Sequence, residues 1–254
     1  MFLKKVFVFL ITLFCFSFGN CSEQNSEKIK IVYWSDYACP YCYIGEKILE
    51  KAIVELDLKD KIEIEMKAFE LDPSASREVQ SRTDERFAKK YGMSLEDARN
   101  QIEKISNLGR AEGINFKYAE TQYTNTLDAH RLTKFAVAKG KDVEKIIHLL
   151  FNAYFTKNLK LLDRKILANI AQQVEINEDE LNAMLDSEDF ISEVRKDENE
   201  AYALGIHGVP FFIIKDKYIP GVPTKESIKQ ILSKAIEEQN LKTGAFCSLE
   251  GCSS

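Results

Sequence analysis

Two cysteines separated by two residues, Cys39 and Cys42, are the side chains of this sequence best suited to chemistry. Such a pair holds two thiols close enough either to exchange a disulfide or to contribute two ligands to a zinc ion. Here the pair lies between an apolar, strand-like run at residues 29–34 and an amphipathic, helix-like segment at residues 43–56. Because free backbone N–H groups and the helix dipole stabilise a thiolate at a helix start, this placement favours redox chemistry over zinc binding or an inert bridge.

The geometry of a helix start predicts different roles for the two thiols. Cys39 is expected at the exposed beginning of the helix, where its sulfur attacks or is attacked. Cys42, about one turn later, is expected to be more buried and to resolve the mixed disulfide. Pro40 suits the first helical turn because its missing N–H has no helical partner there. Tyr41 either tunes the potential, without a positive charge, or simply packs on the surface.

The residues around this pair predict a small α/β unit followed by helices. Residues 62–68 alternate apolar with charged side chains, as a half-buried strand does. With the strand at 29–34 and the helix at 43–56 they form a right-handed βαβ unit. Residues 73–204 then show about six amphipathic helices and no alternating segment. The predicted helix caps are Ser94, Asp163, Asn177 and Thr224 at helix starts and Gly140 and Gly205 at helix ends.

Strand patterns return near the end of the chain. Residues 209–214 form an apolar run, residues 218–219 begin a returning strand, and a last helix follows. The order is therefore βαβ, helices, then ββα. This order predicts an α/β fold in which one small domain, residues 29–72 and 205–241, is interrupted by an all-helical insertion at residues 73–204.

Three segments, taken together, resemble one known family. They are Asp36-Tyr-Ala-Cys-Pro-Tyr-Cys-Tyr-Ile-Gly45, Asn125-Thr-Leu-Asp-Ala-His-Arg131 and Gly208-Val-Pro-Phe-Phe212. Over residues 29–241 the chain resembles the DsbA family of the thioredoxin superfamily, in its FrnE-like branch. The resemblance implies a thioredoxin-like fold with a helical insertion and a thiol:disulfide oxidoreductase activity. Kappa-class glutathione transferases and 2-hydroxychromene-2-carboxylate isomerases share the architecture but typically lack the second cysteine, so Cys42 favours the disulfide branch.

The resemblance also assigns supporting residues and partners. It implies a cis peptide bond between Val209 and Pro210, with Pro210 beside Cys39 and the Val209 backbone bonding to an extended substrate strand. His130 is placed on a helix facing the site, where it either exchanges a proton near Cys39 or packs that helix onto the domain. The expected substrates are unfolded or extended polypeptides, and the expected electron partner is a redox protein. No metal or organic cofactor is required.

The N-terminus predicts export. Residues 1–20 combine two lysines near the start with an apolar run that suits a secretory signal peptide and is short for a membrane span. The predicted location is the periplasm or the outer side of a membrane. Cys21 follows where a bacterial lipoprotein carries its acylated cysteine, so a lipid tether and ordinary secretion both stay open. The polar residues 21–28 predict a tether before the domain.

A second cysteine pair lies in the predicted C-terminal tail, residues 242–254. A disulfide between Cys247 and Cys252 closes a very short loop and constrains little chain entropy, so a large stabilising effect is not its best explanation. Two readings stay open. The pair either relays electrons to Cys39 and Cys42 or forms a simple tail disulfide.

Composition narrows the remaining function classes. With 45% hydrophobic and 30% charged residues, the 254-residue chain buries a core, which excludes a disordered tail or a small disulfide scaffold. The net charge of −5, without a basic block, excludes a nucleic-acid partner. Three alternatives to a thiol oxidase stay open: a reductase or isomerase kept reduced by an upstream partner, a non-catalytic surface binding lipoprotein on the same fold, and a zinc module using both cysteine pairs.

Overall fold

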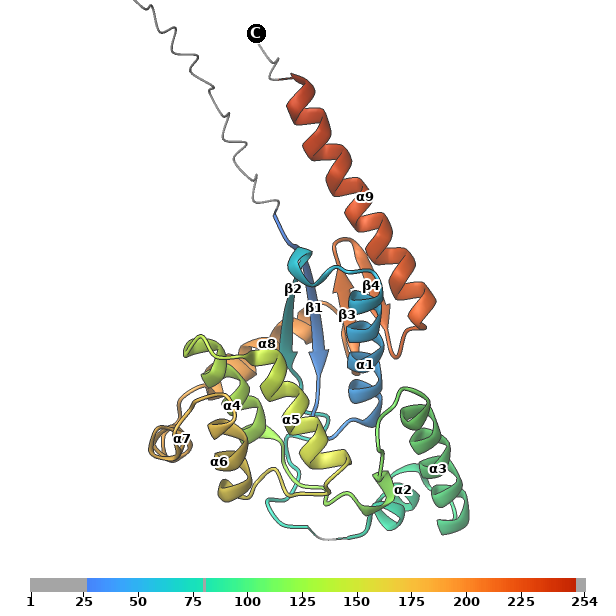
Figure 1. Cartoon of the computed structure of the whole chain (residues 1–254). Coiled ribbons are helices and arrows are strands. Elements are labelled where there is room, and N and C mark those ends of the chain that lie inside the picture. The colour runs from blue at the N-terminus through green and yellow to red at the C-terminus, as the bar shows by residue number, and fades with distance from the viewer. Residues whose placement is uncertain (1–26, 80, 250–254) are drawn as a thin grey trace, which may run out of the picture.

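A four-stranded sheet forms the centre of the computed structural model, which describes residues 27–79 and 81–249 (Figure 1). The strands are β1 (Ile29–Ser35), β2 (Ile62–Ala68), β3 (Phe211–Ile214) and β4 (Lys217–Pro220), in the order β2-β1-β3-β4. β2 runs parallel to β1, whereas β3 is antiparallel to both of its neighbours. The strand predicted over residues 209–214 begins only at Phe211, because Pro210 has no N–H to donate to a ladder.

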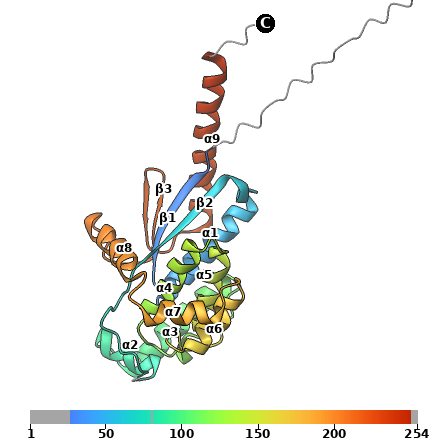
Figure 2. The same ribbon diagram turned by 90° about the vertical axis from the view of Figure 1, so that its left-hand side faces the viewer.

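Helices cover both faces of this sheet (Figure 2). On one face lie α1 (Pro40–Glu55), which is followed by the short helix η1 (Lys59–Lys61), and α9 (Lys225–Leu249), which contacts α1. On the other face α8 (Ile191–Ala203) packs on β2. The indole Nε1 of Trp34 donates to the Asp197 carbonyl of α8 at 2.9 Å and seals a small second core. In sequence α8 lies within the predicted helical insertion, but in the structure it packs against the sheet and buries part of one face.

The remaining helices form a layer beside the carboxyl end of β1. They are α2 (Thr83–Tyr91), α3 (Leu95–Ala111), η2 (Tyr118–Glu120), α4 (Leu127–Ala138), α5 (Val143–Phe155), α6 (Arg164–Gln172) and α7 (Glu178–Asp186). Counting α8, the described part of residues 73–204 holds seven α-helices, one more than about six predicted. Aromatic rings join this layer to α1, since Tyr43 stacks on Phe151 with 5.0 Å between ring centroids.

The predicted helix caps are confirmed. Ser94, Asp163, Asn177 and Thr224 each accept a backbone N–H of the following helix turn through a side-chain oxygen. Gly140 and Gly205 have φ of 63° and 74°, the left-handed conformation that glycine adopts without strain. The four side-chain acceptors satisfy N–H groups that a helix start otherwise leaves without a partner.

Helix α9 is longer than predicted. It continues to Leu249, so the backbone at residue 247 is helical, whereas Cys252 lies outside the described residues together with the predicted signal peptide and Cys21. From Lys225 to residue 247 the helix rises about 33 Å, and it leads away from the start of α1 (Figure 1). The electron relay from the tail therefore stays a prediction, and in this conformation Cys247 is remote from Cys39.

Candidate active site

The two motif cysteines lie where β1 ends and α1 begins. Cys39 is the N-cap of α1, in extended backbone conformation, and Pro40 is the first residue of the helix. The N–H of Cys39 donates to the Asp36 carbonyl at 3.0 Å, and the N–H of Cys42 donates to the Cys39 carbonyl at 3.1 Å. These bonds fold the segment into a tight turn that places both thiols within the first helical turn. Both cysteines are free thiols in this structure.

Cys39 is less exposed than predicted. Its residual exposure is 3%, against 1% for Cys42, so the expected exposed position of Cys39 is wrong. The covering element is the loop before β3, because the Sγ of Cys39 lies 3.5 Å from the Val209 carbonyl oxygen and is placed to donate to it. That loop is 170 residues away in the chain, and local sequence patterns do not reveal such a contact. Tyr41, by contrast, is 41% exposed beside the buried pair.

The loop that covers Cys39 contains the cis bond that the family resemblance implies, between Val209 and Pro210. Its position is fixed by a second contact, in which the N–H of Gly221 donates to the Pro210 carbonyl at 2.8 Å. The Val209 carbonyl thus faces the sulfur while Pro210 is tied to the end of β4. The bonding of the Val209 backbone to a substrate strand stays a prediction.

Gly45 allows this loop to approach α1. A Cβ at residue 45 would lie 3.1 Å from Cζ of Phe212 and 3.4 Å from Cγ of Pro210. We predict that Gly45→Ala lowers the free energy of unfolding by about 1 kcal/mol, because shifting the buried ring and the proline loop costs more than the ~0.5–1 kcal/mol that alanine gains over glycine inside a helix. Urea denaturation measures the change. Gly208→Ala is the matched control, since a Cβ there meets nothing within 4 Å; equal losses in both variants would contradict the packing argument.

The environment of Cys42 keeps its thiol protonated. Burial raises the pKa of this thiol well above its ordinary value, and the neighbouring sulfur of Cys39 raises it further. The backbone of Asp36 and the hydroxyl of Ser35 act in the opposite direction, with smaller effect. Cys42 is therefore a poor nucleophile at neutral pH, since the thiolate is the reactive form.

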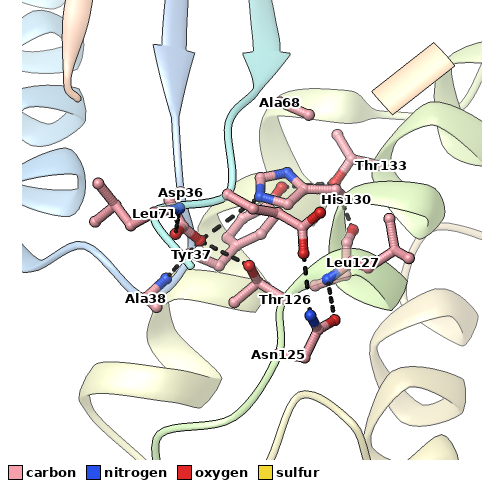
Figure 3. Close-up of polar contacts among 12 residues, drawn as sticks. Asp36, Tyr37, Ala38, Ala68, Leu71, Asn125, Thr126, Leu127, His130 and Thr133 are labelled. Carbon is pink, nitrogen blue, oxygen red and sulfur yellow. Dashed lines mark hydrogen bonds and ion pairs between the residues drawn. The ribbon is translucent and has the colours of Figure 1, made fainter. Parts of the chain in front are cut away.

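A buried carboxylate, Asp36, holds the turn that precedes Cys39 (Figure 3). Its Oδ1 accepts from the Ala38 N–H at 3.0 Å and from the Thr126 hydroxyl at 2.9 Å, and its Oδ2 accepts from the Leu71 N–H at 2.8 Å. Asp36 is 1% exposed and so ties together the segments after β1 and β2 and the start of α4. Sequence analysis missed this role because an aspartate after a strand is typical of an ordinary turn.

His130 lies behind this carboxylate (Figure 3). Its Nε2 is 3.6 Å from Oδ1 of Asp36, and its ring centroid is 4.9 Å from that of Tyr37. The Tyr37 hydroxyl in turn lies 2.6 Å from the Thr133 hydroxyl, also on α4. These contacts favour the packing role for His130 over direct proton exchange at Cys39, and both roles stay predictions.

The contacts of Arg131 indicate that the segment from Asn125 to Arg131 has a largely structural role. The guanidinium of Arg131 is buried and donates to the carbonyls of Met184, Ser187 and Asp189, which follow one another around the end of α7. These bonds anchor α4 to the neighbouring helices. α4 is thereby held in the position from which Thr126 contacts the active-site turn.

In a comparison with protein-family models, residues 30–233 match the DSBA-like thioredoxin domain. The chain belongs to the DSBA-like thioredoxin family. It is similar to the uncharacterized protein YwbO of Bacillus subtilis, with 29% identity over 216 residues that cover 84% of this chain and 98% of YwbO. The predicted FrnE-like branch within the family stays a prediction.

Two solved structures agree with the fold. The crystal structure of a probable DsbA oxidoreductase from Streptomyces coelicolor has a TM-score of 0.77 and 30% identity, covering 83% of this chain and 91% of that one. A putative protein disulfide isomerase from Nitrosomonas europaea has a TM-score of 0.62 and 13% identity over 84% of this chain and 99% of that one, and it supports the fold alone. The family makes this chain a DsbA-like thiol:disulfide oxidoreductase with a thioredoxin-like α/β fold and a helical insertion.

Proposed function

We propose that the chain exchanges disulfides with polypeptide thiols through Cys39 and Cys42. One observation carries the proposal: the two thiols share the first turn of α1, and the sulfur of Cys39 faces the Val209 carbonyl beside Pro210. This turn places the Cys39 sulfur at the helix N-terminus and keeps the Cys42 thiol, buried like its neighbour, in the protonated form. Such a difference between two neighbouring thiols suits stepwise disulfide exchange.

The oxidising direction runs through two exchanges. A substrate thiolate attacks Sγ of Cys39 in the Cys39–Cys42 disulfide, the S–S bond breaks, and Cys42 leaves with the electron pair and takes up a proton. A second substrate thiolate then attacks the substrate sulfur of the mixed disulfide, and Cys39 leaves as a thiolate. The substrate loses two electrons to the enzyme, and a redox partner protein removes them. Reduction and isomerisation use the same mixed disulfide in other directions, and the redox potential decides between them.

Extended or unfolded polypeptides fit this site best. The loop at Val209 and Pro210 leads directly into β3 and offers backbone groups beside Cys39, so a substrate strand can add to it by β-augmentation. Pro40 starts the helix below the sulfur, and the exposed ring of Tyr41 lies beside the pair. In this proposal His130 is a positioning residue that acts through Asp36.

The proposed location is outside the cytoplasm. It rests on the signal-like residues 1–20 and on Cys21 as a candidate lipid attachment site, all outside the described residues. Within residues 27–79 and 81–249, no helix has both the length and the apolar character needed to cross a membrane.

A redox titration tests the proposed function. The protein is equilibrated in glutathione buffers of graded potential, and its thiols are trapped and counted by mass. We expect Cys39 and Cys42 to titrate together as one two-electron transition, because the disulfide between them forms or breaks with the transfer of two electrons. A pair that stays in one state across the whole series would contradict the enzyme and favour the binding-protein alternative. Cys247→Ser in the same series tests the relay, which predicts a change in the transition.

A further inference from the structure

A cavity of about 420 Å³ is lined by residues of α1, α5 and the strands β1 and β2. Its volume is in the range of small-molecule sites. The apolar part of the wall consists of Leu49, Ile53, Ile62, Ile64, Val143 and Ile147. The cavity lies along α1, beyond the turn that carries Cys39 and Cys42, and no step of disulfide exchange uses it.

One polar atom in this wall has no partner. Oε2 of Glu46 is buried from solvent, and no hydrogen bond to it occurs within the described residues. Burial raises the pKa of this carboxyl to about 8, with smaller effects of neighbouring charges. A buried carboxyl without a partner costs free energy that a suitable ligand group would recover. The Glu46 carboxyl, partly exposed in the wall of the cavity, therefore favours a ligand with a hydrogen-bond donor.

The wall of the cavity around Glu46 contains more carboxyl groups than ammonium groups. The other titratable groups of the wall are Tyr33, Glu50, Lys59, Asp142, Glu144, Lys145 and His148, and Lys47 of α1 also acts on Glu46. Lys47 pairs with Glu50 at 2.6 Å, and Lys145 donates to the Gln173 carbonyl at 2.6 Å, so neither ammonium is directed to Glu46. Burial lowers the pKa of His148, which keeps its ring neutral and able to accept a hydrogen bond.

We infer that this cavity binds a small organic cation, a primary ammonium on an apolar body, with the ammonium donating to the carboxylate of Glu46, which lines the cavity. The apolar wall takes the body of the ligand, and the unpartnered carboxyl takes its charge. An anion is disfavoured, because Glu144 would repel it at neutral pH and the ionised Glu46 would add to this repulsion at pH 8. This inference does not rest on disulfide exchange.

Calorimetric titration with n-hexylammonium chloride tests the inference, with 1-hexanol as the uncharged probe of the same length. At pH 8 we expect n-hexylammonium to bind at least about tenfold more tightly than 1-hexanol, because an ionic hydrogen bond to a partly buried carboxylate contributes about 1.5–3 kcal/mol. Glu46→Gln should remove this difference and leave hexanol binding unchanged. Equal affinities in the wild type, an unchanged preference in Glu46→Gln, or no binding of either probe would overturn the inference.

A control variant tests whether the effect is specific to Glu46, and a second amine tests whether the ligand is a small molecule or a polypeptide side chain. Glu178→Gln, at an exposed position of α7, should bind both probes as the wild type does. Nα-acetyl-lysine amide carries the same ammonium on the side chain of a polypeptide residue. We expect it to bind more weakly than n-hexylammonium, and tighter binding would overturn the assignment to a small amine in favour of a polypeptide side chain.

The pH dependence gives an independent readout. The affinity for n-hexylammonium should rise about 6- to 30-fold from pH 6 to pH 8, because the ionised fraction of a group with a pKa of about 8 rises from about 1% to one half and the ionic hydrogen bond contributes about 1.5–3 kcal/mol. Glu46→Gln should show no such rise. A flat profile in the wild type would contradict the role of Glu46.

The stability of the unliganded protein tests the buried carboxyl itself. A folded-state pKa raised to about 8 means that the stability is complete below the unfolded value of 4.5 and falls as the pH rises through 8. Glu46→Gln should therefore raise the melting temperature at pH 8 and leave it unchanged at pH 4. Equal melting temperatures at pH 8 would overturn the premise that this carboxyl is buried without a partner.

Discussion

Replacing Cys39 by serine is expected to reduce disulfide exchange to the uncatalysed rate. Serine keeps the shape of the side chain with a smaller oxygen in place of sulfur, and it neither forms a disulfide nor ionises near neutral pH. Cys42 cannot substitute for it, since burial raises the pKa of its thiol and it lies at 1% exposure. The measurement is the rate at which the oxidised protein converts a reduced dithiol peptide to its disulfide.

Cys247→Ser is the matched control for this loss. It removes a thiol from α9, far along the helix from the active-site turn, and should retain exchange with the peptide. Full activity in Cys39→Ser would show that another sulfur is attacked by the substrate. Equal losses in the two variants would point to an obligatory relay through the C-terminal pair.

Asp36→Ala is expected to lower the free energy of unfolding by about 3–5 kcal/mol. The carboxylate accepts from Ala38, Leu71 and Thr126, and its removal leaves three buried donors without their partner. The turn before Cys39 loses its attachment to the segment after β2 and to α4, so exchange should slow as well. Urea denaturation gives the stability, and the peptide assay gives the rate.

Thr126→Val provides the graded comparison. It removes one of the three donors and keeps the shape of the side chain, so the expected cost is about 1–2 kcal/mol. The exposed Asp179, on α7, is the surface control, and Asp179→Ala should change stability by less than about 0.5 kcal/mol. If Asp36→Ala costs no more than Asp179→Ala, Asp36 does not hold the turn.

Local patterns predicted the elements that carry the thiols. The alternation at residues 62–68 gave β2 with its observed bounds, and the apolar run before Cys39 gave β1 to within one residue. The cis bond at Pro210 came from family resemblance and is present. These features follow from side-chain period, turn chemistry and motif, all of which are local properties of the chain.

Contacts between segments that are distant in the chain could not be predicted from these local sequence patterns. The burial of Cys39 depends on a loop 170 residues away, and the role of Asp36 depends on Thr126, 90 residues away. Glu46 reads as a solvated charge on the polar side of α1, whereas the packing of α5 beside α1 encloses its Oε2. Sequence periodicity thus assigns a charged side chain such as Glu46 to the solvent-exposed side of a helix even where tertiary packing buries it.

Trapping the mixed disulfide tests the central claim most directly. In Cys42→Ser the reduced Cys39 can attack a peptide disulfide, but no second thiol on α1 resolves the product. Mass spectrometry of the digested adduct should find the peptide bound to Cys39, and no adduct should form when Cys39→Ser is treated in the same way. A peptide bound to another cysteine, or equal adduct yields from the two variants, would contradict the assignment of Cys39 as the reacting sulfur.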